Sequence, residues 1–96
     1  MDYKSFIKST SNKTPPNLDS ELLVAMWNAL KGNWDTAHEI VQEIDSLEAA
    51  WIHAYLHRVE GDLSNAKYWY RRAKHDTIDL SLEEEAEMII RDIVKE

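Results

Sequence analysis

Apolar residues recur along most of this chain at the three- and four-residue spacing that places them on one face of an α-helix. The clearest case lies near the C-terminus, where an apolar stripe opposes a charged one. The apolar positions are Leu82, Ala86, Ile89, Ile90 and Ile93. The opposite positions are Glu83, Glu84, Glu87, Arg91 and Lys95. This pattern predicts an amphipathic helix that covers apolar surface left by other helices.

The same period predicts four earlier helices and no strand, so the expected fold class is all-α with five helices. Gly32 and Gly61 are expected to stop the first and third helices, because glycine adopts the left-handed conformation that ends many helices. The expected ranges are 18–31, 34–45, 47–60, 63–75 and 82–95. The expected N-terminal caps are Asn17 or Asp19, then Asn33, Ser46, Asp62 and a capping box of Ser81 with Glu84.

The first 17 residues have a different composition. They are rich in Ser, Thr, Lys and Asn and end near Pro15-Pro16, a pair that cannot lie inside a helix. We therefore expect residues 1–17 to form a flexible N-terminal arm, with Tyr3, Phe6 and Ile7 as the side chains that could hold it to the body. Residues 18–96 are expected to form a single helical-repeat domain.

The middle of the chain contains an internal repeat. Gly32 and Gly61 are 29 residues apart, and this shift aligns residues 25–44 with residues 54–73. Each unit reads as a helix, a glycine stop, an Asn or Asp cap and a second helix. The shared pattern is a glycine, a bulky residue two positions on, an alanine and a further bulky residue: Gly32, Trp34, Ala37, Val41 and Gly61, Leu63, Ala66, Tyr70.

This pattern resembles the tetratricopeptide helical hairpin, although the repeat here is five residues shorter than that family's. The sequence of residues 38–44 and 51–58 also resembles that of a group of short bacterial proteins of unknown activity. The tetratricopeptide resemblance implies two helical hairpins followed by a C-terminal capping helix, and a role in binding a protein or peptide.

The predicted helix 47–60 departs from the tetratricopeptide pattern in one respect. Its polar residues His53, His57 and Glu60 fall within about 60° of one another on a helical wheel, and the rest of the helix is mostly apolar, with Arg58 as the main interruption. The family places apolar residues where this chain has the two histidines. The counterpart of His57 in the first unit is Asn28, also polar.

Several interpretations of this polar stripe are open. A hydrogen-bonded layer would fix how the helices pair, since buried polar groups need partners. Histidines at i and i+4 are spaced to bind one metal ion, with Glu60 or His38 completing the site. His57 or His53 with Glu60 is also a pattern for general acid–base chemistry. Outside the metal hypothesis, we expect His38 to be exposed on a helix face.

Composition narrows the function classes. The chain has no cysteine, which excludes disulfides and thiolate zinc sites. Its net charge of −7 argues against nucleic acid as the partner, although residues 58–75 are locally basic and aromatic. No apolar stretch reaches the length of a membrane span, so we expect a cytoplasmic protein without a membrane partner.

Together these features favour a non-enzymatic interaction module with a recognition face on the third and fourth helices. We expect no cofactor, no catalytic residue and no metal in this interpretation; the alternative is a small enzyme or metal-binding protein that uses the His53, His57 and Glu60 face. The expected partner is a protein, a peptide or a small anion, and the chain would be a monomer or homodimer. The expected binding residues are Asn28, His53, His57, Arg58, Glu60, Tyr68 and Arg71.

Overall fold

The computed structural model describes residues 1–76 and 79–96, and in this part of the chain all regular structure is helical, as expected. The six helices found there are α1 (Tyr3–Ser9), α2 (Glu21–Leu30), α3 (Trp34–Gln42), α4 (Leu47–Glu60), α5 (Leu63–Arg72) and α6 (Leu82–Val94). The prediction of five helices was therefore wrong. The additional one is α1, in the segment expected to be a flexible arm.

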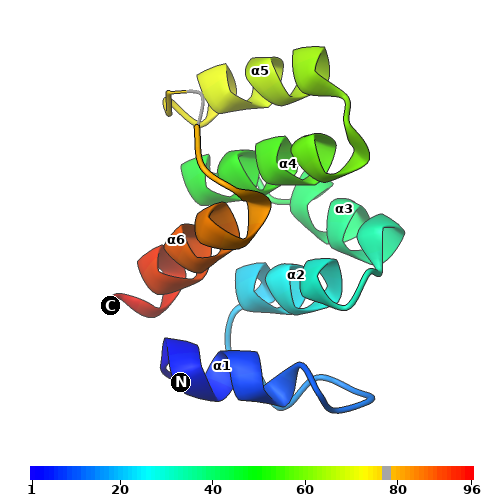
Figure 1. The fold of residues 1–96 in the computed structure, drawn as a ribbon, viewed down its shortest axis with the longest axis vertical. Helices are drawn as coiled ribbons and strands as arrows, with labels where there is room; N and C mark the ends of the chain where they lie inside the picture. Colours follow the sequence, from blue (N-terminus) through cyan, green and yellow to red (C-terminus); the bar gives the residue numbers. More distant parts are fainter. Residues whose placement is uncertain (77–78) are drawn as a thin grey trace.

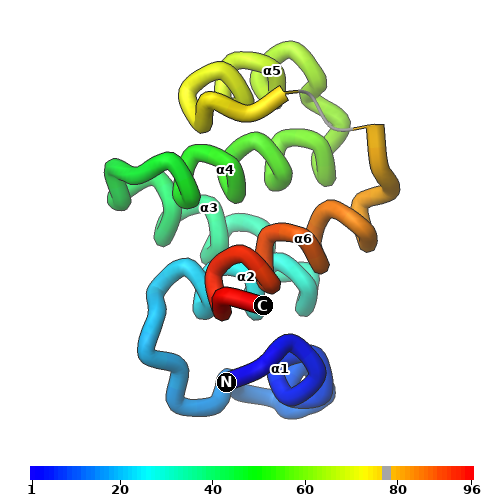
Figure 2. Tube along the Cα trace, turned by 90° about the vertical axis from the view of Figure 1, so that its left-hand side faces the viewer, coloured from blue at the N-terminus to red at the C-terminus, as the bar shows by residue number. Residues whose placement is uncertain are grey.

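The helices are stacked along the long axis of the molecule. Figure 1 shows α5 at one end, then α4, then the pair α2 and α3, and α1 at the other end. The last helix, α6, does not continue this order. It returns along the side of the stack and packs against α4, α2 and α1 (Figure 2). The chain ends therefore lie close together, and the backbone N–H of Tyr3 donates to the carboxylate of Glu96 at 3.2 Å.

The helix boundaries follow local signals in the sequence. Gly32 and Gly61 have φ angles of +84° and +85°, as predicted for helix stops. Both turns have the same hydrogen bonds, because the N–H after each glycine reaches back to Asn28 O and His57 O at 2.8 and 2.9 Å. Side-chain caps form at Ser46 and Asp62, and the predicted capping box forms at Ser81.

One predicted cap was wrong, and another was right in position but not in its side-chain bond. The cap of α2 is Ser20, whose hydroxyl accepts from the N–H of Leu23, in place of Asn17 or Asp19. Asn33 occupies the cap position of α3, but its side chain makes no capping bond and instead donates to the amide oxygen of Asn28 at 3.2 Å.

Helix α4 is the centre of the fold, since nine consecutive residues, Ala49–His57, are buried. The predicted covering role of α6 is consistent with its burial pattern: Ala86, Ile89 and Ile90 are buried on the side that faces the stack. No helix in the described part of the chain has the length and apolar content that crossing a bilayer requires.

The N-terminal segment belongs to the packed body. The side chain of Phe6 is fully buried in the main core. The indole N–H of Trp27 donates to Ser9 O at 3.4 Å, and the ammonium of Lys31 donates to Thr10 O and Asn12 O, both at 2.8 Å. These contacts connect α1 and its following turn to α2.

The packing of α1 leads to a first prediction. Phe6→Ala should lower the free energy of unfolding by about 3 kcal/mol, because it leaves a cavity in the core. The neighbouring change Ile7→Ala, at a side chain that is 36% exposed, should cost less than about 1 kcal/mol. Urea denaturation of both variants measures the difference. Equal, small losses would show that the segment is a flexible arm after all.

Candidate functional site

The polar stripe predicted on α4 lies against α3, where a third histidine joins it. His38 of α3 lies 2.9 Å from His53, measured between their Nε2 atoms, so one of these nitrogens donates a hydrogen bond to the other. His57, one turn further along α4, stacks beside His53 with ring centroids 5.0 Å apart. One ring nitrogen from each of the three histidines lies within 4.8 Å of the other two. We call these three residues the histidine cluster.

Two tryptophans enclose the histidine cluster. The ring of His53 is stacked on Trp69 of α5 with centroids 3.7 Å apart, and the ring of His38 is stacked on Trp34 of α3 at 4.8 Å. Trp34 is itself held in place, because its indole N–H donates to Leu56 O at 2.7 Å. The rings of His38 and His53 are therefore each oriented by a flat contact with a tryptophan, whereas His57 meets Trp34 edge-on with ring centroids 5.9 Å apart.

Burial controls the charge of this cluster. His53 and His57 are 5% and 6% exposed, whereas His38 is half-buried. The pKa of His53 is lowered from 6.5 to about 4, first by burial and then by repulsion from charge on His38 and His57. Burial, followed by charge on His57, also lowers the pKa of His38. At neutral pH, His38 and His53 are therefore uncharged.

One carboxylate contacts the histidine cluster. Glu60 accepts a hydrogen bond from His57 Nδ1 at 2.6 Å, and its side chain is 40% exposed. The predicted grouping of His53, His57 and Glu60 on one face is therefore present. The expectation that His38 is exposed on a helix face was wrong, because α3 crosses α4 at the point where the two histidines lie.

A pocket of about 470 Å³ lies beside the histidine cluster. It is formed by the end of α3, the loop that follows, the first half of α4, and α5. His53, Trp69 and Arg72 belong to its lining. The other lining residues are apolar Val41, Ile44, Leu47 and Ala50 and polar Gln42, Glu43, Asp45 and Ser46. The pocket connects the histidine cluster to the basic surface of α5.

Tyr68 and Arg71, two of the predicted binding residues, are exposed on α5. The hydroxyl of Tyr68 accepts a hydrogen bond from the guanidinium of Arg72 at 2.9 Å. Asn28 is placed elsewhere, because it donates to Val24 O at 2.9 Å and its amide oxygen accepts from Asn33. These side-chain hydrogen bonds connect α2 to itself and to the residue before α3, and neither of them reaches the histidine cluster.

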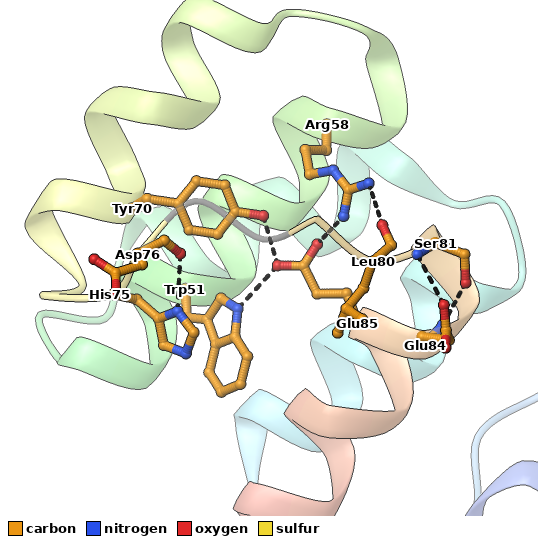
Figure 3. Close-up of polar contacts among 9 residues, drawn as sticks. All are labelled: Trp51, Arg58, Tyr70, His75, Asp76, Leu80, Ser81, Glu84 and Glu85. Carbon is orange, nitrogen blue, oxygen red and sulfur yellow. Dashed lines mark hydrogen bonds and ion pairs between the residues drawn. The ribbon is translucent and has the colours of Figure 1, made fainter.

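Arg58 has an internal role that the sequence did not reveal. Its guanidinium donates to the carboxylate of Glu85 on α6 at 2.5 Å and to Leu80 O at 2.7 Å. Glu85 is fully buried and also accepts from the indole of Trp51 at 3.0 Å and the hydroxyl of Tyr70 at 2.5 Å. Figure 3 shows the carboxylate surrounded by these three donors. Arg58 is thereby committed to joining α4 to α6.

The surroundings of Glu85 favour this charged pair. Burial tends to lower the pKa of Arg58, but the hydrogen bond and charge of Glu85 raise it above its ordinary value. Burial and the hydrogen bond to Glu85 also raise the pKa of Tyr70, so its hydroxyl remains protonated and continues to donate. The spacing of Glu85 gave a usable signal, since it lies three residues after Leu82 and four before Ile89 on the apolar stripe of α6.

Comparisons with protein-family models, with curated proteins and with solved structures found no match for this chain.

The buried pair gives a second prediction. Arg58→Met should lower the free energy of unfolding by about 3 kcal/mol, because it leaves the carboxylate of Glu85 without its counter-ion. Arg91→Met removes a cation from a surface pair with Glu87 and Glu96 and should cost less than about 1 kcal/mol. Chemical denaturation at neutral pH compares them. Similar losses in the free energy of unfolding would mean that the folded interior does not depend on Arg58, so that its guanidinium is available to bind a ligand.

The histidine cluster gives a third prediction, on pH. Unfolded His53 takes up a proton near pH 6.5, whereas folded His53 does so only near pH 4. Between these values the unfolded state binds more protons, so stability falls as the pH falls. Without metal ions, the free energy of unfolding of the unchanged chain should fall by about 1–3 kcal/mol more than that of His53→Gln between pH 7 and pH 4.

The control for the pH experiment is His75→Gln, which removes the one histidine outside the cluster. This variant should keep the pH dependence of the unchanged chain in the same denaturation series. If His53→Gln shows the same pH dependence as the unchanged chain, His53 is not the cause of the loss of stability at low pH.

Proposed function

We propose that the chain is a non-enzymatic interaction module whose α5 face binds an acidic segment of a partner protein. The observation that carries the proposal is the charge of α5 within an acidic chain. Its ten residues include Lys67, Arg71 and Arg72 and no Asp or Glu, although the chain as a whole has a net charge of −7. All three cations are exposed. A positively charged surface attracts carboxylate-rich segments.

The cations of α5 are available for a partner. None of the ion pairs recorded among residues 1–76 and 79–96 involves Lys67, Arg71 or Arg72. The guanidinium of Arg72 is held over the rings of Trp69 and Tyr68, at 5.4 and 5.9 Å from their centroids. This arrangement orients the donor group before a ligand arrives, which reduces the entropy lost on binding.

Apolar contact area lies next to these charges. The side chain of Tyr68 is 42% exposed, and Trp69 forms part of the pocket wall. Aromatic side chains with a polar edge are frequent at the centre of protein interfaces. Glu43 and Asp45 line the pocket together with Val41, Ile44, Leu47 and Ala50, and this apolar part would accept a hydrophobic side chain from the same segment while its carboxylates contact α5. The occupant that fits is an acidic segment with interspersed apolar residues.

The proposed module is a duplicated helical hairpin of the tetratricopeptide-like kind. The identical hydrogen bonds after Gly32 and Gly61 support this proposal, as does the pairing of α2 with α3 and of α4 with α5. The first helices of the two hairpins, α2 and α4, are both packed by α6. Because α6 covers one face of the stacked helices, we expect a partner to bind on the α5 side.

A fourth prediction tests the α5 face with a defined probe, a fluorescently labelled short peptide that alternates Glu and Phe. Arg71→Gln combined with Arg72→Gln should weaken its binding at least about tenfold, since two carboxylate contacts are lost. Higher salt should weaken binding by the unchanged chain. A peptide with Lys in place of Glu should not bind. Fluorescence anisotropy measures each case.

The matched control is Lys4→Gln combined with Lys13→Gln. It changes the net charge by the same amount at exposed positions on the N-terminal segment. This variant should bind the acidic peptide nearly as well as the unchanged chain. Equal weakening in the two double variants would show that only the overall charge matters, and would overturn the assignment of the site to α5.

A further inference from the structure

We propose that His38, His53 and His57 form a binding site for a divalent transition-metal ion of the zinc class. One ring nitrogen from each residue lies within 4.8 Å of the other two, so a single ion placed among them would contact all three with small side-chain movements. The site would have three imidazole ligands and an open fourth position. This inference is independent of the α5 binding face.

The distances in the histidine cluster are close to those that a metal requires. With zinc–nitrogen bonds of about 2.0–2.1 Å, two ligand atoms of a tetrahedral site are about 3.3 Å apart. The nitrogens of His38 and His53 are 2.9 Å apart and therefore need to separate by a few tenths of an ångström. The nitrogen of His57 needs to approach the pair by rotation of its side chain.

The contact between Glu60 and His57 is a second feature typical of metal sites. The carboxylate accepts from Nδ1 at 2.6 Å, so the proton of a neutral imidazole is held on Nδ1. The lone pair is then on Nε2 and is free to bind an ion. Histidine ligands commonly donate their other ring N–H to a carboxylate in this way, which fixes the ring and strengthens the metal bond. Glu60 is therefore a positioning residue.

The aromatic walls also suit this role. Trp69 supports the ring of His53 and Trp34 supports the ring of His38, so two of the three ligand rings are confined by stacking. His53 and His57 come from successive turns of α4, and half-buried His38 of α3 leaves an approach from solvent. Bound metal would join the two hairpins, because α3 and α4 belong to different ones.

The ligand types select the class of ion. Imidazole nitrogen suits zinc, copper and nickel, whereas magnesium and calcium require oxygen ligands. A second group, buried His57 with exposed Glu60 and Asp62, shares one histidine with the cluster. In the present arrangement Glu60 is already bonded to Nδ1 of that histidine, which makes it a support for the histidine cluster. We therefore expect the three histidines to bind a soft or borderline divalent ion.

The test uses untagged full-length chain freed of metal with a chelator and titrated with zinc chloride by calorimetry. The unchanged chain should bind one zinc ion per chain and unfold at a higher temperature in its presence. His38→Gln should weaken zinc binding at least about tenfold, because it removes one of three ligands. The half-buried position of His38 makes this the variant that best preserves the fold. His75→Gln should bind like the unchanged chain.

A measurement on the unchanged chain makes the test independent of any folding defect. In histidine-selective NMR spectra, zinc should shift the ring signals of three histidines and leave those of His75 in place. The proposal is overturned if zinc does not bind saturably, if His38→Gln binds as well as the unchanged chain, or if the His75 signals shift instead. The Arg71→Gln and Arg72→Gln double variant should keep zinc binding, which separates this site from the proposed peptide face.

Discussion

The burial of α4 on nearly every side is the constraint on which the rest of the structure depends. Nine consecutive residues of this helix are inaccessible, and two of them are histidines. Polar groups in such a position must have hydrogen-bond partners, because an unsatisfied buried group costs roughly 1–3 kcal/mol. No buried side-chain nitrogen or oxygen lacks a partner in the described part of the chain. The neighbouring helices are arranged so that they supply those partners.

Two polar clusters result, on opposite faces of α4. Trp51 and Arg58 are seven residues apart, so they lie on the same side of the helix, facing Glu85 of α6. His53 and His57 lie about 200–240° further round, facing α3 and α5. The first cluster is a closed ion pair with every oxygen in use and serves to hold α6. The second contains uncharged His38 and His53, is partly open to solvent and lies next to a pocket, which makes it the better candidate for function.

The sequence predicted those parts of the fold that depend on local interactions. Gly32 and Gly61 mark helix ends because few other residues adopt their backbone conformation, and Ser46 and Asp62 mark helix starts because their side chains accept from the first turn. The grouping of His53, His57 and Glu60 followed from helical periodicity alone. These features require no knowledge of which helices touch.

Apart from the caps of α2 and α3, the errors concern contacts between distant segments. Helix α1 is short and polar, and it is held by burial of Phe6 against helices that follow it in the sequence. His38 joins the histidine cluster only because α3 crosses α4 there. The pairing of Arg58 with Glu85 was not predicted, because the two residues are 27 positions apart in the sequence. Tertiary packing decided each of these positions.

Native-state hydrogen exchange tests the central role of α4 most directly. If the fold is built around this helix, the amides within residues 49–57 should exchange only when the whole chain unfolds, with a free energy equal to that of global unfolding. The amides of α1 and of the outer helix α5 should exchange through smaller openings. Exchange from α4 at the same low free energy as from α5 would contradict the account.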